Sequence, residues 1–197
     1  QFAEDAGPTA HPIRPDHYIE IGNFYTLTIY EKGAEVVRML RNLLGWELFR
    51  RGSDLYFERL DGQAATIEDF VGCMSEVSGL DLTQFMHWYS QAGTPEIDAH
   101  GEYDYAKSEY HLTLRQRTAP TPGQPDKVAL HIPIRMGLVG TKSGQDLKMT
   151  VDGESVGTDT VIHLREYEQH FVFTDLAEAP VPSLLRGFSA PVKLRFP

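Results

Sequence analysis

The sequence lacks several features that would assign a protein to a class at once. It has one cysteine, Cys73, so no disulfide can form within the chain, which fits a reducing compartment. No apolar run approaches the roughly 20 residues that cross a bilayer. The acidic start, Gln1 to Asp5, is unlike a signal peptide, and we expect an excised segment of a longer protein. These absences favour a cytoplasmic protein that does not act at a membrane. Cys73 lies in an apolar helical pattern, which predicts a buried structural thiol.

Motifs of several enzyme classes are also missing. The chain has no H-E-x-x-H, no G-x-S-x-G and no glycine spacing of a phosphate-binding or dinucleotide-binding loop. Its eight histidines are scattered, and the nearest approach to a motif is His163 and His170, seven residues apart. A zinc site needs several ligands at a set spacing. We therefore predict no metal ligands in this segment and interpret each histidine as a surface or hydrogen-bonded residue.

Charge is acidic and uneven. The net charge of −10 argues against binding to nucleic acid, which requires a basic face. Residues 1–98 carry 7 Lys and Arg against 16 Asp and Glu, whereas residues 99–197 carry 11 against 12. This asymmetry indicates two units. An acidic first unit could favour the cationic amino terminus of a peptide, and a solvated acidic surface explains the counts equally well.

The first half has the periodicity of helices. Residues 1–22, rich in proline and charge, predict a loop or an extended segment. Apolar residues recur at helical spacing over 30–44 and again over 47–60. Thr66 is a predicted N-cap for a third helix, and Asp81 marks the start of a fourth. These helices carry one apolar face each and must pack against one another.

After Ala92-Gly-Thr-Pro95 the apolar period changes from 3.6 to 2, with turns rich in glycine and proline between short runs. This pattern predicts an antiparallel β-sandwich. The fold class is therefore α+β and multidomain, with a helical domain over 1–95 and a β-sandwich over 96–197. The candidate strands are 110–114, 128–138, 160–164, 170–173 and 191–196.

The sharpest candidate site is the stretch Asn23–Val37. It places two aromatic residues, Tyr25 and Tyr30, just before a helix whose first turn carries Glu31 and Glu35. A helix N-terminus has unpaired N–H groups and a positive dipole end, which explains the two acids structurally. A tyrosine hydroxyl held there is a good hydrogen-bond donor to a developing oxyanion.

Several stretches resemble the bacterial aminopeptidase N family, which are zinc alanyl aminopeptidases of the gluzincin type. The resemblance implies that residues 1–95 form the helical C-terminal part of a thermolysin-like catalytic domain. It implies that residues 96–197 form a β-sandwich that links this part to a C-terminal helical domain. The stretches are Ala10-His-Pro-Ile-Arg-Pro15, Tyr30-Glu-Lys-Gly-Ala34, Leu55-Tyr-Phe-Glu-Arg-Leu-Asp-Gly-Gln-Ala-Ala-Thr66, Trp88-Tyr-Ser-Gln-Ala-Gly-Thr-Pro95 and Phe188-Ser-Ala-Pro-Val-Lys-Leu194.

The same resemblance implies roles for individual residues. Tyr30 matches the tyrosine that donates to the scissile carbonyl oxygen, and Tyr25 matches an aromatic residue of the substrate cleft, although packing under the helix explains Tyr25 equally well. His11 and Arg14 would help to hold the cleft wall. In the family, the zinc ligands and the catalytic glutamate lie upstream of this segment. We therefore expect a fragment that is inactive alone, with peptides as substrates of its parent and the upstream half and C-terminal domain as partners in cis.

A non-enzymatic reading stays open. The β-rich half and the incomplete site also fit a β-sandwich interaction module with a helical cap. An H-E-x-x-H upstream of Gln1 in the same reading frame would favour the enzyme, and a start or stop codon immediately before Gln1 would favour the module.

Overall fold

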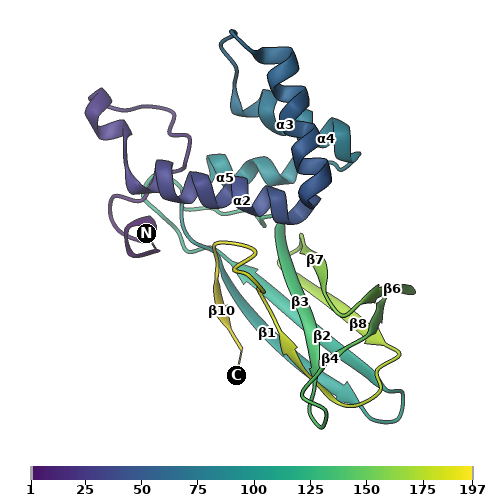
Figure 1. The fold of residues 1–197 in the computed structure, drawn as a ribbon. Coiled ribbons are helices and arrows are strands. Elements are labelled where there is room, and N and C mark those ends of the chain that lie inside the picture. Colours follow the sequence, from purple (N-terminus) through teal and green to yellow (C-terminus); the bar gives the residue numbers. More distant parts are fainter. Residues whose placement is uncertain (1, 197) are drawn as a thin grey trace. The chain divides into compact units, whose positions relative to one another are not determined.

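The computed structural model describes residues 2–196, which divide into two compact units (Figure 1). The first unit holds the chain up to Gly93 together with Pro120–Leu130, and the second holds Thr94–Ala119 and the chain from His131 onward. The sequence pattern placed the division at residue 95. It gave no sign that Pro120–Leu130, a stretch rich in turn residues, returns to the helical unit.

The first unit is helical, with short irregular turns before its main helices. No helix among the described residues is long and apolar enough to cross a membrane. The elements are α1 (Phe2–Asp5), η1 (Ile21–Phe24), η2 (Thr28–Lys32), α2 (Gly33–Leu44), α3 (Trp46–Leu60), α4 (Ile67–Ser78), η3 (Gln84–Met86) and α5 (His87–Ser90).

Helix α2 forms because its apolar residues follow the helical period. They make one face, and every member of that face is buried, as the pattern predicts. The helix ends at Gly45, whose φ of +77° lies in a region that residues with a side chain rarely adopt. The buried face consists of Val36, Met39, Leu40, Leu43 and Leu44.

Helices α3 and α4 pack against each other as a hairpin (Figure 1). The predicted N-cap is confirmed: Thr66 Oγ1 accepts from the Asp69 N–H at 3.2 Å, and the Asp69 carboxylate accepts from the Thr66 N–H at 2.8 Å. This reciprocal pair is a capping box. Gly52 permits close packing, because a Cβ there would lie 2.4 Å from Met74 Sδ. Cys73 is buried and free, as expected.

The predicted fourth helix is shorter than its pattern suggested. It consists of the 3₁₀ turn η3 followed by one turn of α5. Asp81 Oδ1 accepts from the Thr83 N–H at 2.9 Å and so forms a local turn. The aromatic side chains of Phe85, Trp88 and Tyr89 are nevertheless buried, and burial raises the pKa of Tyr89 to about 12.

The second unit consists of two sheets (Figure 1). One has the strand order β10-β1-β2-β8-β5-β6, and the other has β4-β3-β7 with β9 also paired to β3. All pairs are antiparallel except β1 with β10, which is parallel. The strands are β1 (Glu96–Asp104), β2 (Glu109–Arg117), β3 (Ile132–Gly140), β4 (Asp146–Leu147), β5 (Met149–Val151), β6 (Glu154–Gly157), β7 (Thr160–Leu164), β8 (Glu168–Thr174), β9 (Pro180–Ser183) and β10 (Lys193–Arg195).

The α+β class with a helical part and a β-rich part is therefore confirmed. Alternation predicts β2 well, because its residues at every second position from Tyr110 to Gln116 are buried. The predicted run over 128–138 was wrong at its start, because the strand begins at Ile132 and residues 128–130 belong to the first unit. The pattern also missed β1, β4, β5, β6 and β9.

Candidate functional site

Tyr30 lies in a π-helical turn rather than in front of the helix. The turn, η2, spans Thr28–Lys32 and runs directly into α2, and Leu27 before it already has helical angles. The sequence interpretation, which placed Tyr30 just ahead of the helix, is corrected in this respect. Single π-helical turns are rare and occur frequently at functional sites.

The two candidate tyrosines face outward together. Tyr30 is 60% exposed and Tyr25 is 59% exposed, and their rings stack with centroids 6.2 Å apart at an interplanar angle of 27°. Tyr25 also meets Phe24 edge to face at 5.7 Å. The phenol of Tyr30 is thus on the surface of its unit, where a second molecule or another part of a longer chain can reach it.

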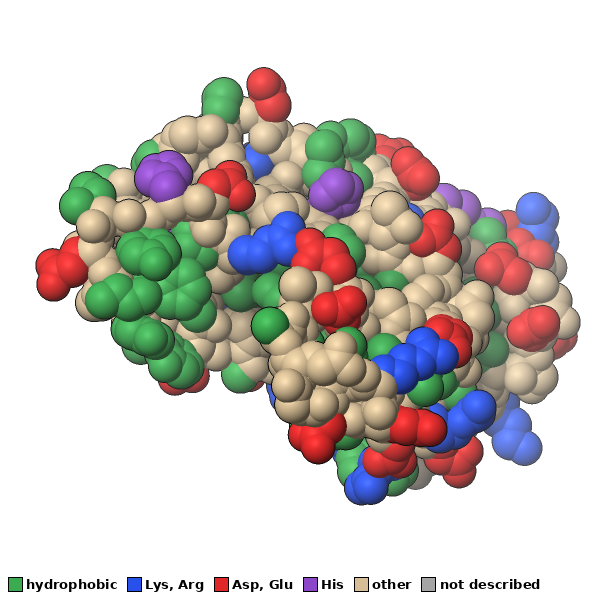
Figure 2. All heavy atoms as spheres, turned by 90° about the horizontal axis from the view of Figure 1, so that it is seen from above, with side chains coloured by type: hydrophobic (Ala, Val, Ile, Leu, Met, Phe, Trp, Pro, Cys, Tyr) green, Lys and Arg blue, Asp and Glu red, His purple; other side chains and the backbone are tan. Residues whose placement is uncertain are grey.

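Apolar side chains surround this pair on the same segment. Figure 2 shows hydrophobic side chains gathered on the left of the face in view. Among the described residues, a set of large apolar side chains between 18 and 30 is more than half exposed. A pocket of about 250 Å³ lies beside them and includes His11, Phe24 and Ile29 in its lining. The exposed set is Tyr18, Ile19, Ile21, Tyr25, Leu27 and Tyr30.

His11 joins the preceding loop to the start of the helix. Its Nδ1 lies 2.8 Å from the Pro12 carbonyl oxygen, and its Nε2 lies 2.9 Å from Thr26 Oγ1. Thr26 Oγ1 also accepts from the Ile29 N–H at 3.3 Å. The loop is held further at Arg14, whose N–H donates to the Tyr89 carbonyl at 2.9 Å and whose guanidinium pairs with Glu68. His11 and Arg14 therefore both fasten this loop to helical elements.

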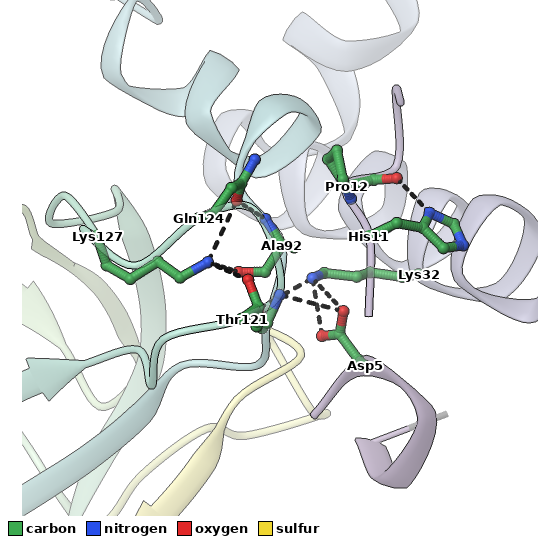
Figure 3. Close-up of polar contacts among 9 residues, drawn as sticks. Asp5, His11, Pro12, Lys32, Ala92, Thr121, Gln124 and Lys127 are labelled. Atoms are coloured by element: carbon green, nitrogen blue, oxygen red, sulfur yellow. Dashed lines mark hydrogen bonds and ion pairs between the residues drawn. The ribbon is translucent and has the colours of Figure 1, made fainter. Parts of the chain in front are cut away.

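Lys32, on the same π-helical turn, is buried and forms an ion pair with Asp5 (Figure 3). Its Nζ donates to Asp5 Oδ1 at 3.0 Å, to Asp5 Oδ2 at 2.8 Å and to the Gly93 carbonyl at 3.0 Å. Asp5 Oδ1 in turn accepts from the Gly93 N–H at 3.3 Å. Burial lowers the pKa of Lys32, and the opposite charge and hydrogen bond of Asp5 oppose that decrease.

A second lysine holds the neighbouring backbone (Figure 3). Lys127 Nζ donates to the Ala92 carbonyl at 2.9 Å, to Thr121 Oγ1 at 2.6 Å and to Gln124 Oε1 at 3.2 Å. Gln124 also accepts from the Ala92 N–H at 2.8 Å and donates to the Ser90 carbonyl at 2.9 Å. These contacts explain why Pro120–Leu130 belongs to the helical unit.

The two acidic residues of the first turn differ in their surroundings. Glu35 forms an ion pair with Arg38 at 2.6 Å along α2, and Glu31 is exposed. Lys32 is different, since no sequence pattern assigned it a role, and its hydrogen bonds to Asp5 and Gly93 hold the turn.

The histidines are less scattered than the sequence suggested. Two pairs meet across strands in the second unit: His131 with His163, and His111 with His170. Burial is the main reason why the pKa of His131 falls to about 3, and the pKa of His163 is lowered as well. Within residues 2–196, no group of three or more histidine, cysteine, aspartate and glutamate side chains could hold a metal ion. The described residues therefore do not fit a zinc site.

Two residues at this site escaped the sequence interpretation, namely Thr26 and Lys32. Thr26 carried a local signal, because a threonine flanked by aromatic residues at positions −1 and +4 matches a helix cap with its apolar staple. Lys32 carried none, because its partner Asp5 lies 27 residues away.

Comparison with known protein families gives two matches that together cover nearly all of the chain. Residues 1–89 match the "Peptidase family M1 domain". Residues 93–197 match a "Domain of unknown function (DUF3458) Ig-like fold". The division between the two matches falls at the point where the helical unit gives way to the sheets.

Individual relatives agree with these matches. The chain is 50% identical over 196 residues to "Aminopeptidase N" of Escherichia coli (strain K12), which covers all of this chain and 22% of the relative. It is 48% identical over 196 residues to "Aminopeptidase N" of Haemophilus influenzae, and this match covers 100% of this chain and 22% of the relative. It is 50% identical over 194 residues to "Aminopeptidase N" of Caulobacter vibrioides, and this match covers 98% of this chain and 21% of the relative. This chain thus spans about a fifth of the length of these relatives.

Solved structures also match, and one of them is similar over nearly the whole chain. The crystal structure of Legionella pneumophila aminopeptidase A in complex with aspartic acid gives a TM-score of 0.78 at 30% identity. The match covers 97% of this chain and 21% of that one.

Proposed function

This chain belongs to the DUF3458 family of Ig-like domains, joined here to a helical part that matches the M1 peptidase domain, and from that premise we propose that its parent is a zinc metallo-aminopeptidase. The parent would act in the cytoplasm, remove amino-terminal residues from peptides and so contribute to peptide degradation. This segment would supply the tyrosine that stabilises the oxyanion, and a second aromatic residue of the substrate cleft. The zinc ligands would come from parts of the parent outside this segment.

The observation that carries the proposal is the outward-facing phenol of Tyr30 on the π-helical turn, stacked on Tyr25, which lies just before that turn. Tyr30 is exposed on a structured helix start, in a segment that matches the M1 domain. A phenol is neutral at pH 7 and can donate one hydrogen bond. A fixed donor of this kind can stabilise the negative charge that develops on a scissile carbonyl oxygen. Tyr25, stacked on Tyr30, would contact the peptide side chain or backbone beside the reacting bond.

The experiment is a kinetic comparison in the full-length parent. Tyr30→Phe removes only the hydroxyl and should lower kcat by about 10²–10³, the loss typical of one such donor, while KM changes little. Tyr105→Phe is the matched control, because Tyr105 is an exposed tyrosine of the second unit. Equal kcat values for the wild type and Tyr30→Phe would reject the role of Tyr30.

The isolated 197-residue chain provides a second test. We expect it to bind no stoichiometric zinc and not to hydrolyse an aminoacyl anilide, since it would hold only part of the site. Hydrolysis by the purified chain that survives removal of contaminating peptidase would contradict this view of the segment.

A further inference from the structure

The hydrogen bonds at the start of the π-helical turn form a directed chain. A carbonyl oxygen only accepts, so the contact between His11 Nδ1 and the Pro12 carbonyl at 2.8 Å requires the proton to lie on Nδ1. In the neutral ring Nε2 is then an acceptor. With the ring in this neutral form, the Thr26 hydroxyl, 2.9 Å away, donates its single proton to His11.

This direction leaves the lone pairs of Thr26 for the helix. Its Oγ1 accepts from the Ile29 N–H at 3.3 Å, and its carbonyl oxygen accepts from the Tyr30 N–H at 3.2 Å. With Leu27 as the first helical residue, Thr26 is the N-cap and Ile29 is the third residue of the helix. The imidazole of His11 therefore determines how the hydroxyl that caps this helix is turned.

The two tyrosines flank this cap at matched positions. Tyr25 directly precedes Thr26, and Tyr30 is the fourth helical residue, which are the two positions of a hydrophobic staple. Their rings are in contact, as that motif requires, and are stacked with centroids 6.2 Å apart. The backbone at Thr26 lies between the two staple positions, so a change in its conformation would shift Tyr25 relative to Tyr30.

We propose that His11 and Thr26 are positioning residues for the Tyr30 hydroxyl, an inference that rests on the proposed function of Tyr30. Neither residue need touch the substrate. Their part is to hold the first turn so that the phenol of Tyr30, which is 60% exposed, stays directed at the reacting oxygen. A displacement of about 1 Å at such a donor can cost about 10²-fold in rate.

The surrounding contacts hold the loop that carries His11 in place. Arg14, three residues later, is held by the Tyr89 carbonyl and by Glu68. Ile13 between them is buried. The loop is thus fixed to α4 and α5, and the contact between the His11 imidazole and the Thr26 hydroxyl joins it to the start of η2.

The test uses the full-length parent and a pair of matched variants. Thr26→Val keeps the shape but removes the hydroxyl, and we expect kcat to fall at least tenfold with KM changed less than twofold. Thr26→Ser keeps the hydroxyl and should retain kcat within about threefold of the wild type. His11→Ala leaves the capping hydroxyl in place but frees its direction, and it should lower kcat by a similar factor.

The Tyr30→Phe background separates positioning from a general loss of structure. If Thr26 acts through the Tyr30 hydroxyl, Thr26→Val should cause no further loss of kcat once that hydroxyl is gone, and the same holds for His11→Ala. An equal loss in both backgrounds would overturn the proposal, as would an unchanged kcat in Thr26→Val. If Thr26→Val fails to fold, the His11→Ala cycle decides the matter by the same criterion.

These outcomes are distinguishable from failure of the proposed function. If Tyr30→Phe leaves kcat unchanged, Tyr30 is not the donor and both proposals fall. If Tyr30→Phe lowers kcat while Thr26→Val and His11→Ala do not, the role of Tyr30 stands and the positioning role of His11 and Thr26 is rejected.

Discussion

Removal of Asp5 should destabilise the helical unit strongly, because it leaves Lys32 charged and buried. The side chains of Asp5 and Lys32 are 2% and 3% exposed, and the pair is joined by two hydrogen bonds. Breaking a buried pair by deleting one partner costs about 3–5 kcal/mol. Asp5→Ala also removes the acceptor of the Gly93 N–H, so we expect the upper part of this range.

The magnitude can be measured by urea unfolding of the 197-residue chain. Both tryptophans, Trp46 and Trp88, lie in the helical unit, so tryptophan fluorescence follows that unit alone. With a denaturant slope of about 2 kcal/mol/M, a loss of 3–5 kcal/mol lowers the urea midpoint by about 1.5–2.5 M. Glu76→Gln is the control, because it breaks the exposed pair with Arg59 and should move the midpoint far less.

A second substitution identifies the cause. Lys32→Met alone leaves the Asp5 carboxylate buried and should also be destabilising, whereas Asp5→Ala with Lys32→Met removes both charges. Replacing a buried ion pair by apolar groups is often neutral. The double variant should therefore be more stable than the sum of the two single losses by more than about 1 kcal/mol. Additive losses, or a midpoint shift for Asp5→Ala below about 0.5 M, would refute the argument.

The pH dependence provides a further check on sign. Burial lowers the pKa of Lys32 below its unfolded value of 10.5, so the unfolded chain binds more protons between the two pKa values and stability from this group rises with pH there. Asp5→Ala removes the two interactions that raise this pKa. The pH range between the folded and unfolded pKa values of Lys32 then extends to lower pH. The destabilisation caused by Asp5→Ala should therefore shrink as the pH rises toward 10.

Three further predictions concern other parts of the chain. Thr66→Ala removes the capping box of α4 and should cost about 0.5–2 kcal/mol in the same urea assay. Gly101→Ala should destabilise the second unit by about 1–3 kcal/mol, measured by its far-UV circular dichroism, because a Cβ there would lie 1.7 Å from the Tyr110 hydroxyl oxygen and the Tyr110 ring would have to move. Acid should destabilise the second unit as the pH falls from 6.5 toward 3, because the pKa of buried His131 is lowered to about 3, and His131→Phe should weaken that dependence in circular dichroism.

The helices and several strands were predictable because their determinants are local. The apolar period over 30–44 gave α2, and Thr66 three residues before Asp69 gave the cap of α4. Strands β2 and β7 followed from alternation within a few residues. In each case the residues that specify the element lie within the element or directly beside it.

The misses have a shared physical reason, which is dependence on distant partners. Strand β1 has the charged sequence Glu-Ile-Asp-Ala-His-Gly-Glu-Tyr-Asp, and its pairing with β2 and β10 stabilises it more than its own pattern does. The return of Pro120–Leu130 to the helical unit depends on the hydrogen bonds of Gln124 and Lys127 to residues more than 30 positions away. No local pattern contains this information.

The local part of the candidate site could be predicted from the sequence, and the part that depends on distant residues could not. Tyr25 and Tyr30 were identified from a stretch of contiguous residues, and their stacking follows from their positions around Thr26. Their roles in catalysis remain predictions. The contact of Thr26 with His11, 15 residues earlier, is a tertiary interaction that the sequence did not indicate.

The buried lysine and the exposed tyrosine lie on opposite sides of the π-helical turn. Side chains two positions apart on a helical turn point to roughly opposite sides. Asp5 draws Lys32 into the interior, and Tyr30, two residues earlier, is thereby directed outward. The ion pair fixes the rotation of the turn from the inside, and the contact between His11 and Thr26 fixes its start. Together with the stacking on Tyr25, these contacts would hold the exposed phenol in one direction, as the proposed role of Tyr30 requires.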